Sequence, residues 1–194
     1  MIIYLHGFRS APASHKARSL AARAVERGLT DAFWCEQLPV SAQAAMALVE
    51  PVVERALASP GPAPTLVGSS LGGYYATWLA ERHRLKAVVV NPAVLAPISL
   101  EAYLGPQSNL YTGEQFDFTA AHIAELQALD AGPLRDPRRY WLLAEEGDEV
   151  LDYRHAVARY AGSRQTILPG GDHSFTRWTD FLDEILCFAG LLPA

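Results

Sequence analysis

Residues 65–73 read TLVGSSLGG, an apolar run that ends in two adjacent serines and a pair of glycines. In a nucleophile elbow, a strand turns sharply into a helix and lifts a serine hydroxyl above the sheet, so small residues are needed two positions before and two after that serine. Gly68 and Gly72 occupy those positions around Ser70, whereas Ser69 would have larger neighbours there. The spacing therefore predicts that Ser70 is a nucleophile at a strand–helix turn.

Short β-rich runs alternate with helical patterns along the chain. We expect strands at about 2–6, 32–36, 65–69, 87–91, 140–144 and 166–168. Several are apolar throughout, as strands covered on both faces are. We expect helices at about 17–25, 45–56, 71–82 and 174–188, the second kinked or divided by Pro51. This alternation predicts an α/β fold, a three-layer α/β/α arrangement with a mainly parallel sheet of about six strands.

One long interval interrupts the alternation, because about 48 residues separate the fourth expected strand from Tyr140. Several prolines open it, and a helical pattern around Ile123 and Leu126 follows. Insertions of this length in a compact sheet protein usually have a function. We therefore expect a single domain over residues 1–194, with 92–130 as a cap. The apolar side chains of this cap either line a groove for an acyl chain or only pack the cap onto the sheet.

Composition excludes several classes of function. Half of the 194 residues are apolar and the net charge is −5, so no basic field attracts nucleic acid. Cys35 and Cys187 lie far apart without a CxxC spacing, which favours reduced thiols and a cytoplasmic setting. No apolar run approaches the roughly 18 residues of a membrane span, and the first residues lack a basic leader. The sequence does not distinguish a monomer from a homodimer.

A serine hydroxyl is a weak nucleophile without a base, so a histidine is needed nearby. His173 lies in PGGDHSF, a loop directly after the last expected strand, and is the candidate base. The order nucleophile, acid, base places the acid before it, and Asp148 follows the fifth strand by a short turn. Glu145 and Glu146 remain alternatives, whereas Asp152 is better explained as a helix N-cap.

Attack on a carbonyl builds negative charge on its oxygen, which backbone N–H groups can stabilise. Leu71, the residue after the nucleophile, offers one such group. The loop after the first strand, HGFRS, offers the other from Phe8, with Gly7 letting the backbone approach the ligand. His6 is expected to support this loop more than to act as a base. Arg9 either binds a substrate carboxylate or phosphate or is simply solvated.

The chain resembles the YqiA-like family of small bacterial esterases, within the α/β-hydrolase superfamily. The resemblance covers essentially the whole chain and is carried by YLHGFRSAPASHKA, VGSSLGGYYATWLAE, NPAV, LGPQSNLYTGEQF, EEGDEVLDYRHAV and GGDHSF. It implies an α/β-hydrolase sheet shortened by the two antiparallel strands that open the full fold. It also implies Ser70 as nucleophile, Asp148 as acid, His173 as base, and Phe8 and Leu71 as oxyanion donors.

The expected activity is that of a serine esterase that hydrolyses carboxylic esters through an acyl-enzyme, with a small-molecule substrate and no metal or organic cofactor. An acyl-CoA or other acyl thioesterase would use the same residues. A non-catalytic binding module is the third reading, although such modules usually lack one of the three residues. The candidate substrate contacts are His6, Arg9, Asn91, Tyr103, Leu104 and Tyr111.

Overall fold

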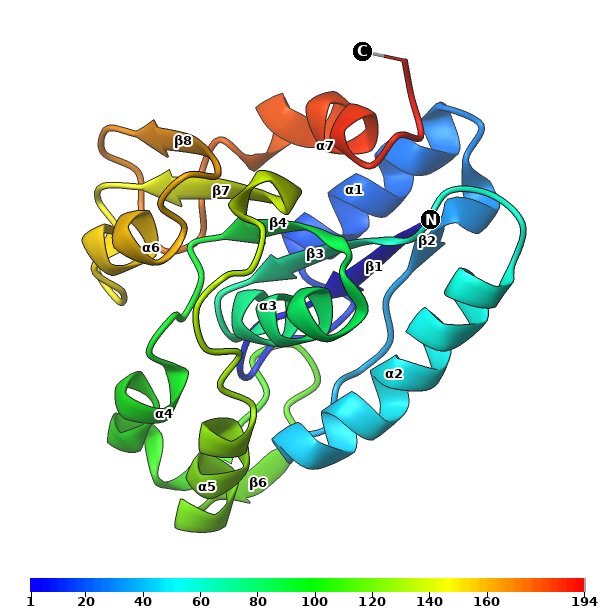
Figure 1. Ribbon diagram of the computed structural model, residues 1–194. Coiled ribbons are helices and arrows are strands. Elements are labelled where there is room, and N and C mark those ends of the chain that lie inside the picture. The colour runs from blue at the N-terminus through cyan, green and yellow to red at the C-terminus, as the bar shows by residue number, and fades with distance from the viewer. Residues whose placement is uncertain (194) are drawn as a thin grey trace.

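The computed structural model describes residues 1–193, and six parallel strands form its central sheet (Figure 1). The strands are β1 (Ile2–Leu5), β2 (Phe33–Trp34), β3 (Thr65–Ser69), β4 (Lys86–Val90), β7 (Tyr140–Glu145) and β8 (Arg164–Leu168). They lie in the order β2-β1-β3-β4-β7-β8, and all five pairings are parallel. The six expected strands are confirmed. Their sheet is parallel throughout, whereas a mainly parallel sheet was predicted.

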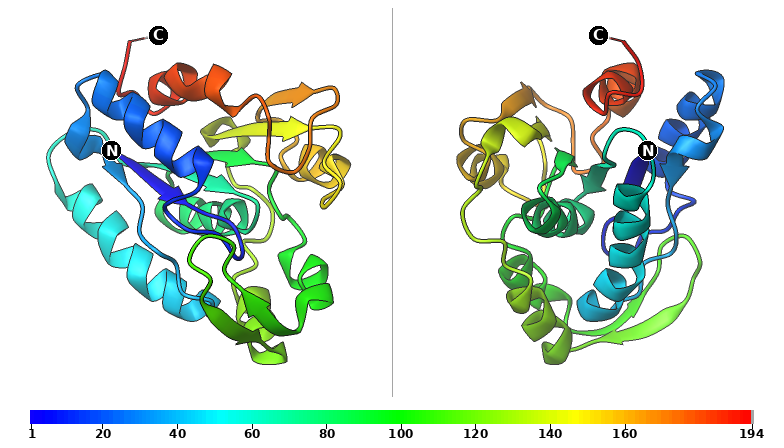
Figure 2. Two further views of the ribbon diagram at one scale, coloured as in Figure 1. Left: turned by 180° about the vertical axis from the view of Figure 1, so that it is seen from behind. Right: turned by 45° about the vertical axis from the view of Figure 1, so that its right-hand side comes forward.

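Helices cover both faces of this sheet (Figures 1 and 2). One face carries α1 (His15–Glu26) and α7 (Leu182–Phe188). The other carries α2 (Ala42–Ala58), α3 (Leu71–His83) and α6 (Tyr153–Arg159). Successive strand residues point to opposite faces, so Val67 packs with the first group and Leu66 with the second. The predicted three-layer architecture is therefore confirmed.

The interval between β4 and β7 forms a small unit of its own, at the bottom of Figure 1. It contains α4 (Ala96–Ser99), β5 (Gly105–Ser108), β6 (Gln115–Phe118) and α5 (Ala120–Ala128). The predicted helical pattern corresponds to α5. The antiparallel β5–β6 hairpin was not foreseen, because β5 reads GPQS and has no alternating apolar pattern.

Pro51 does not divide the second helix, since α2 runs from Ala42 to Ala58 without interruption. The proline ring is exposed, while Val49, Val52 and Val53 beside it are buried. Packing of these valines compensates for the hydrogen bond that the proline cannot donate.

The last helix is shorter than the predicted span 174–188. Residues 174–177 form turns, a 3-10 helix follows at Trp178–Phe181, and only Leu182–Phe188 is α-helical. The cause is a contact with β7: the N–H groups of Thr176 and Arg177 donate to the carboxylate of Glu145, the last residue of that strand. Among residues 1–193, no helix has the length and apolar character that crossing a bilayer requires.

Candidate active site

Ser70 stands at the turn between β3 and α3. Its backbone has φ 55° and ψ −121°, a conformation that L-residues rarely adopt and that usually marks a functional turn. Two hydrogen bonds of 3.0 Å hold it there: the Ser70 N–H donates to the carbonyl of Val90, and the Ala93 N–H donates to the carbonyl of Ser70. The strand–turn–helix setting expected for an elbow is present.

The flanking glycines are required by the backbone packing around this turn. A Cβ atom on Gly68 would overlap the carbonyl group of Gly72, and a Cβ atom on Gly72 would overlap the carbonyl group of Leu5. The spacing in GSSLG thus has a steric cause, and it places Ser70 rather than Ser69 at the apex.

Three side chains from separate loops form one hydrogen-bonded chain at this turn. His173 Nε2 lies 3.1 Å from Ser70 Oγ, and His173 Nδ1 lies 2.9 Å and 3.0 Å from the two carboxylate oxygens of Asp148. Because a carboxylate only accepts, Nδ1 carries the proton and Nε2 can accept from the serine hydroxyl. The geometry brings together the predicted nucleophile, base and acid.

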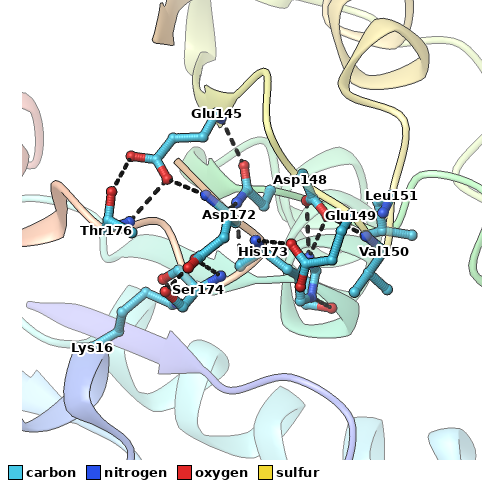
Figure 3. A network of polar contacts seen from close by, with 12 residues as sticks. Lys16, Glu145, Asp148, Glu149, Val150, Leu151, Asp172, His173, Ser174 and Thr176 are labelled. Atoms are coloured by element: carbon cyan, nitrogen blue, oxygen red, sulfur yellow. Dashed lines mark hydrogen bonds and ion pairs between the residues drawn. The ribbon is translucent and has the colours of Figure 1, made fainter. Parts of the chain in front are cut away.

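The Asp148 side chain is held in place by its own loop (Figure 3). Its Oδ1 atom accepts from the N–H groups of Val150, at 2.9 Å, and Leu151, at 2.8 Å. Only 2% of the carboxylate side chain is exposed, against 24% of the His173 side chain. The Asp148 carboxylate is therefore fixed and shielded, while the imidazole borders solvent.

Asn91 lies at the end of β4 and ties the histidine loop to the sheet. Its amide nitrogen donates to the carbonyls of Asp172, at 3.0 Å, and His173, at 3.2 Å. Its amide oxygen accepts from the N–H of Glu145 at 3.0 Å. Backbone groups occupy both the nitrogen and the oxygen of the amide, so Asn91 positions the histidine loop. Asn91 was predicted to contact substrate, but its amide is not available for that contact in the structure.

Glu145, the alternative acid, has a different environment from Asp148. Its fully buried carboxylate accepts hydrogen bonds from the Asp172 N–H and from Thr176 (Figure 3). It also accepts from the Arg177 guanidinium. Burial alone would raise the pKa of Glu145, but these hydrogen bonds outweigh it and lower the pKa to about 2. The side chain thus organises the loop that carries His173.

Replacing Glu145 by Gln is expected to lower the free energy of unfolding at pH 7 by about 2–3 kcal/mol, because the Arg177 guanidinium, the Thr176 hydroxyl and three backbone N–H donors lose a charged acceptor. Urea denaturation measures this change. Glu146→Gln is the matched control, because Glu146 is the exposed next residue, and its loss is expected to stay within about 0.5 kcal/mol. Equal losses in both variants would contradict the anchoring role.

Glu145 also predicts a pH dependence of stability. Its pKa falls from 4.5 in the unfolded chain to about 2 in the folded protein, so its contribution is complete above pH 4.5 and is lost as the pH falls towards 2. The difference in unfolding free energy between the wild type and Glu145→Gln should therefore shrink across this window. A difference that stays constant from pH 6 to pH 2.5 would contradict the assignment.

The backbone of the β1–α1 loop passes directly beside Ser70. A Cβ atom on Gly7 would lie 3.2 Å from Ser70 Cβ, so glycine permits this approach. Among residues 1–193, no acceptor is hydrogen-bonded to the N–H of Phe8 or of Leu71. Both predicted oxyanion donors are thus free at the end of the sheet that carries Ser70.

A cavity of about 610 Å³ opens at Ser70 and His173. Of the predicted substrate contacts, Tyr111 lines it, as does the neighbouring Leu110. His6 and Arg9 line a neighbouring cavity of about 240 Å³, which shares Gly7, Phe8 and Ser10 with the first. His6 is occupied there, because its Nε2 accepts from the Leu38 N–H at 3.0 Å, which agrees with a supporting role.

Three further predicted substrate contacts lie on the inserted unit or bind to it: Tyr103 and Leu104 belong to it, and Arg9 is hydrogen-bonded to it. The guanidinium of Arg9 donates to the carbonyl of Ser108 at 2.9 Å. Tyr103 packs edge-on against Phe8, with 5.7 Å between ring centroids, and Leu104 is 47% exposed. Neither Tyr103 nor Leu104 lines the cavity at Ser70, so the structure does not bring them to the predicted substrate site.

Sequence reasoning missed several cavity residues, among them Ser14 and Lys16, although both stand in the SHKA stretch that follows the HGFRS loop. Their position at the start of α1, shortly after the loop expected to supply an oxyanion donor, was the available signal. Within residues 1–193, no group of three or more His, Cys, Asp and Glu side chains is arranged to hold a metal ion.

The parallel sheet and the serine elbow at its edge define an α/β-hydrolase fold. A profile of the family described as "Uncharacterised protein family (UPF0227)" matches residues 1–190. The chain belongs to this family, which confirms the resemblance to the YqiA-like proteins.

Solved structures with this fold align over nearly the whole chain. Est1E from Butyrivibrio proteoclasticus has a TM-score of 0.69 and 15% identity, covering 96% of this chain and 86% of its own. Alpha/beta hydrolase domain-containing protein 10 from mouse has a TM-score of 0.69 and 16% identity, with 96% and 89% covered. The monoacylglycerol lipase of Paleococcus ferrophilus has a TM-score of 0.66 and 14% identity, with 98% and 94% covered. At these identities the likeness shows the fold alone.

Proposed function

We propose that the protein is a serine esterase that hydrolyses carboxylic esters through Ser70, His173 and Asp148. The observation that carries the proposal is the hydrogen-bonded chain from Ser70 Oγ through the imidazole to the buried carboxylate, at 3.1 Å and 2.9 Å. The kinship in fold with a monoacylglycerol lipase supports an ester as the bond that is cleaved.

The proposed reaction has two stages. His173 Nε2 takes the hydroxyl proton of Ser70 while Oγ attacks the ester carbonyl carbon, and the N–H groups of Phe8 and Leu71 bind the resulting oxyanion. Collapse of this intermediate breaks the bond to the alcohol oxygen, which receives the proton from His173. Water then repeats both proton transfers and releases the acid from the acyl-enzyme.

We also propose that residues 92–130 act as a cap on a single domain. The Leu110 N–H donates to the carbonyl of Arg9 at 2.8 Å, and the amide nitrogen of Asn109 donates to the carbonyl of Ser10 at 2.8 Å. These contacts place the tip of the β5–β6 hairpin on the oxyanion loop. The exposed Leu110 and Tyr111 side chains then border the space that an acyl chain would enter.

This cap role predicts a chain-length effect. Tyr111→Ala should lower kcat/KM for p-nitrophenyl octanoate about fivefold more than for p-nitrophenyl acetate, because the longer chain loses apolar contact. Leu104→Ala is the control, since Leu104 is exposed on the same unit but outside the cavity. Equal losses on both esters would contradict an acyl-contacting cap.

Labelling with a fluorophosphonate followed by mass spectrometry tests the function directly. The expected result is a single adduct on Ser70, and an adduct on Ser69 or none at all would overturn the proposal. Rates with p-nitrophenyl butyrate and butyryl-CoA then separate an esterase from an acyl thioesterase, because both would use the same residues and differ only in the leaving group.

A further inference from the structure

The cavity at Ser70 extends to the beginning of α1. Ser14, His15 and Lys16 line it together with Ser70 and His173. The first turn of this helix of 12 residues therefore faces the same space as the proposed nucleophile.

The start of α1 lacks its usual internal partners. Ser14 is the N-cap residue, yet its side chain makes no capping hydrogen bond, and the first turn contains no acidic residue. Helix N-termini carry unpaired N–H groups and a partial positive charge, which favour a negatively charged partner. Nothing in the first turn supplies one.

The Ser14 hydroxyl is a second, independent sign of an absent partner. Ser14 is only 7% exposed, and its Oγ atom is hydrogen-bonded to no atom of residues 1–193. Buried hydroxyls are almost always paired, because leaving one unpaired costs free energy. Ser14 lines the cavity, and because its Oγ atom is itself buried, the hydroxyl would reach a ligand there by rotating about its Cα–Cβ bond.

Lys16 adds a positive charge to the same wall. Its ammonium donates to the carbonyl of Ser174 at 2.5 Å, and no carboxylate within the described part of the chain pairs with it (Figure 3). Burial lowers the pKa of Lys16 to about 8, while Asp172, Glu145 and Asp148 oppose this shift, so the group is mainly charged at neutral pH. Glu149 lies on the wall too, bound to the His173 N–H.

We propose that the α1 end of this cavity binds an anionic oxygen group, carboxylate or phosphate, through Lys16, the Ser14 hydroxyl and the first turn of the helix. The substrate would then be an ester that carries a negative charge away from the bond that is cleaved. The ligand site stands on its own, and only its identification as part of a substrate rests on the proposed esterase function.

Binding to the Ser70→Ala variant tests the site without any hydrolysis. Isothermal titration with glutarate and, separately, with inorganic phosphate is expected to show binding of one or both, which distinguishes the two anion classes. Adding Lys16→Met or Ser14→Ala should weaken binding about tenfold or more, because each change removes a hydrogen-bond donor to the charged ligand. No binding of either anion, or equal binding after both changes, would overturn the site.

Lys86→Met is the matched control, since it removes the same charge at the opposite end of the sheet. Lys86 begins β4 and donates to the carbonyl of Phe188, far from the strand ends that carry Ser70. Glutarate or phosphate should bind this variant as it binds the wild type. Lys16→Arg, which keeps the charge, should retain most of the affinity, and circular dichroism checks that each variant is folded.

Hydrolysis supplies the second measurement. The ratio of kcat/KM for mono-p-nitrophenyl glutarate to that for p-nitrophenyl butyrate should exceed one in the wild type and fall about tenfold in Lys16→Met. An unchanged ratio would overturn the substrate assignment. If neither ester is hydrolysed while glutarate or phosphate still binds, the esterase proposal fails and the anion site stands.

Discussion

The Ser70→Ala variant should hydrolyse p-nitrophenyl butyrate at least about 10⁴-fold more slowly than the wild type, measured as kcat. Loss of Oγ removes the atom that attacks the carbonyl, while the oxyanion donors and the cavity are retained. Alanine keeps the Cβ atom, so the strained backbone at φ 55° changes little and the fold should be preserved.

Ser69→Ala is the matched control for this prediction. Ser69 is buried at the end of β3, one residue before the turn, and its hydroxyl makes no hydrogen bond to His173. Its kcat should stay within about threefold of the wild type. An active Ser70→Ala protein beside an inactive Ser69→Ala protein would show that the elbow is wrongly assigned. A wild type inert towards esters and thioesters alike would instead favour a binding module.

The second large effect is expected for Asp148→Asn, which should lower kcat at pH 7 by about 10³- to 10⁴-fold. The asparagine amide keeps an oxygen for the N–H groups of Val150 and Leu151, so the loop should remain in place. Its NH₂ group, however, favours the imidazole tautomer with the proton on Nε2. That tautomer cannot accept the proton of Ser70.

Asp152→Asn controls for the loss of a carboxylate in the same loop region. Asp152 caps α6, accepts from the Arg154 N–H at 3.0 Å, and makes no contact with His173. Its kcat should match that of the wild type. If Glu145→Gln lost as much kcat as Asp148→Asn, the acid role would belong to Glu145 or be shared with it.

Most of the architecture was predictable, because the spacing of apolar residues along a strand or helix reflects which faces of that element are buried. The failures have definite causes. The helix expected from residue 174 starts at 182, since the buried Glu145 carboxylate captures the N–H groups of Thr176 and Arg177. The β5–β6 hairpin escaped prediction because its first strand contains Gly105 and Pro106 and little apolar periodicity.

Among the candidate site residues, chain order and local turns were sufficient to predict which side chains would lie together. Ser70, Asp148 and His173 each follow a strand of a parallel sheet, whose carboxyl ends share one edge, and the structure brings them within hydrogen-bonding distance. Asn91 and Tyr103 were expected to contact substrate, yet one binds the histidine loop and the other packs on Phe8.

The sequence by itself determined the serine elbow, because its requirements are local: small residues two positions to either side of Ser70, between an apolar strand and a helix. Only the tertiary structure decided which carboxylate faces His173, and that Ser14 and Lys16 share a cavity with Ser70. These arrangements depend on contacts between residues that are from 25 to 103 positions apart. Which side chains meet across such separations depends on how the elements pack, and a local sequence pattern contains no information on that packing.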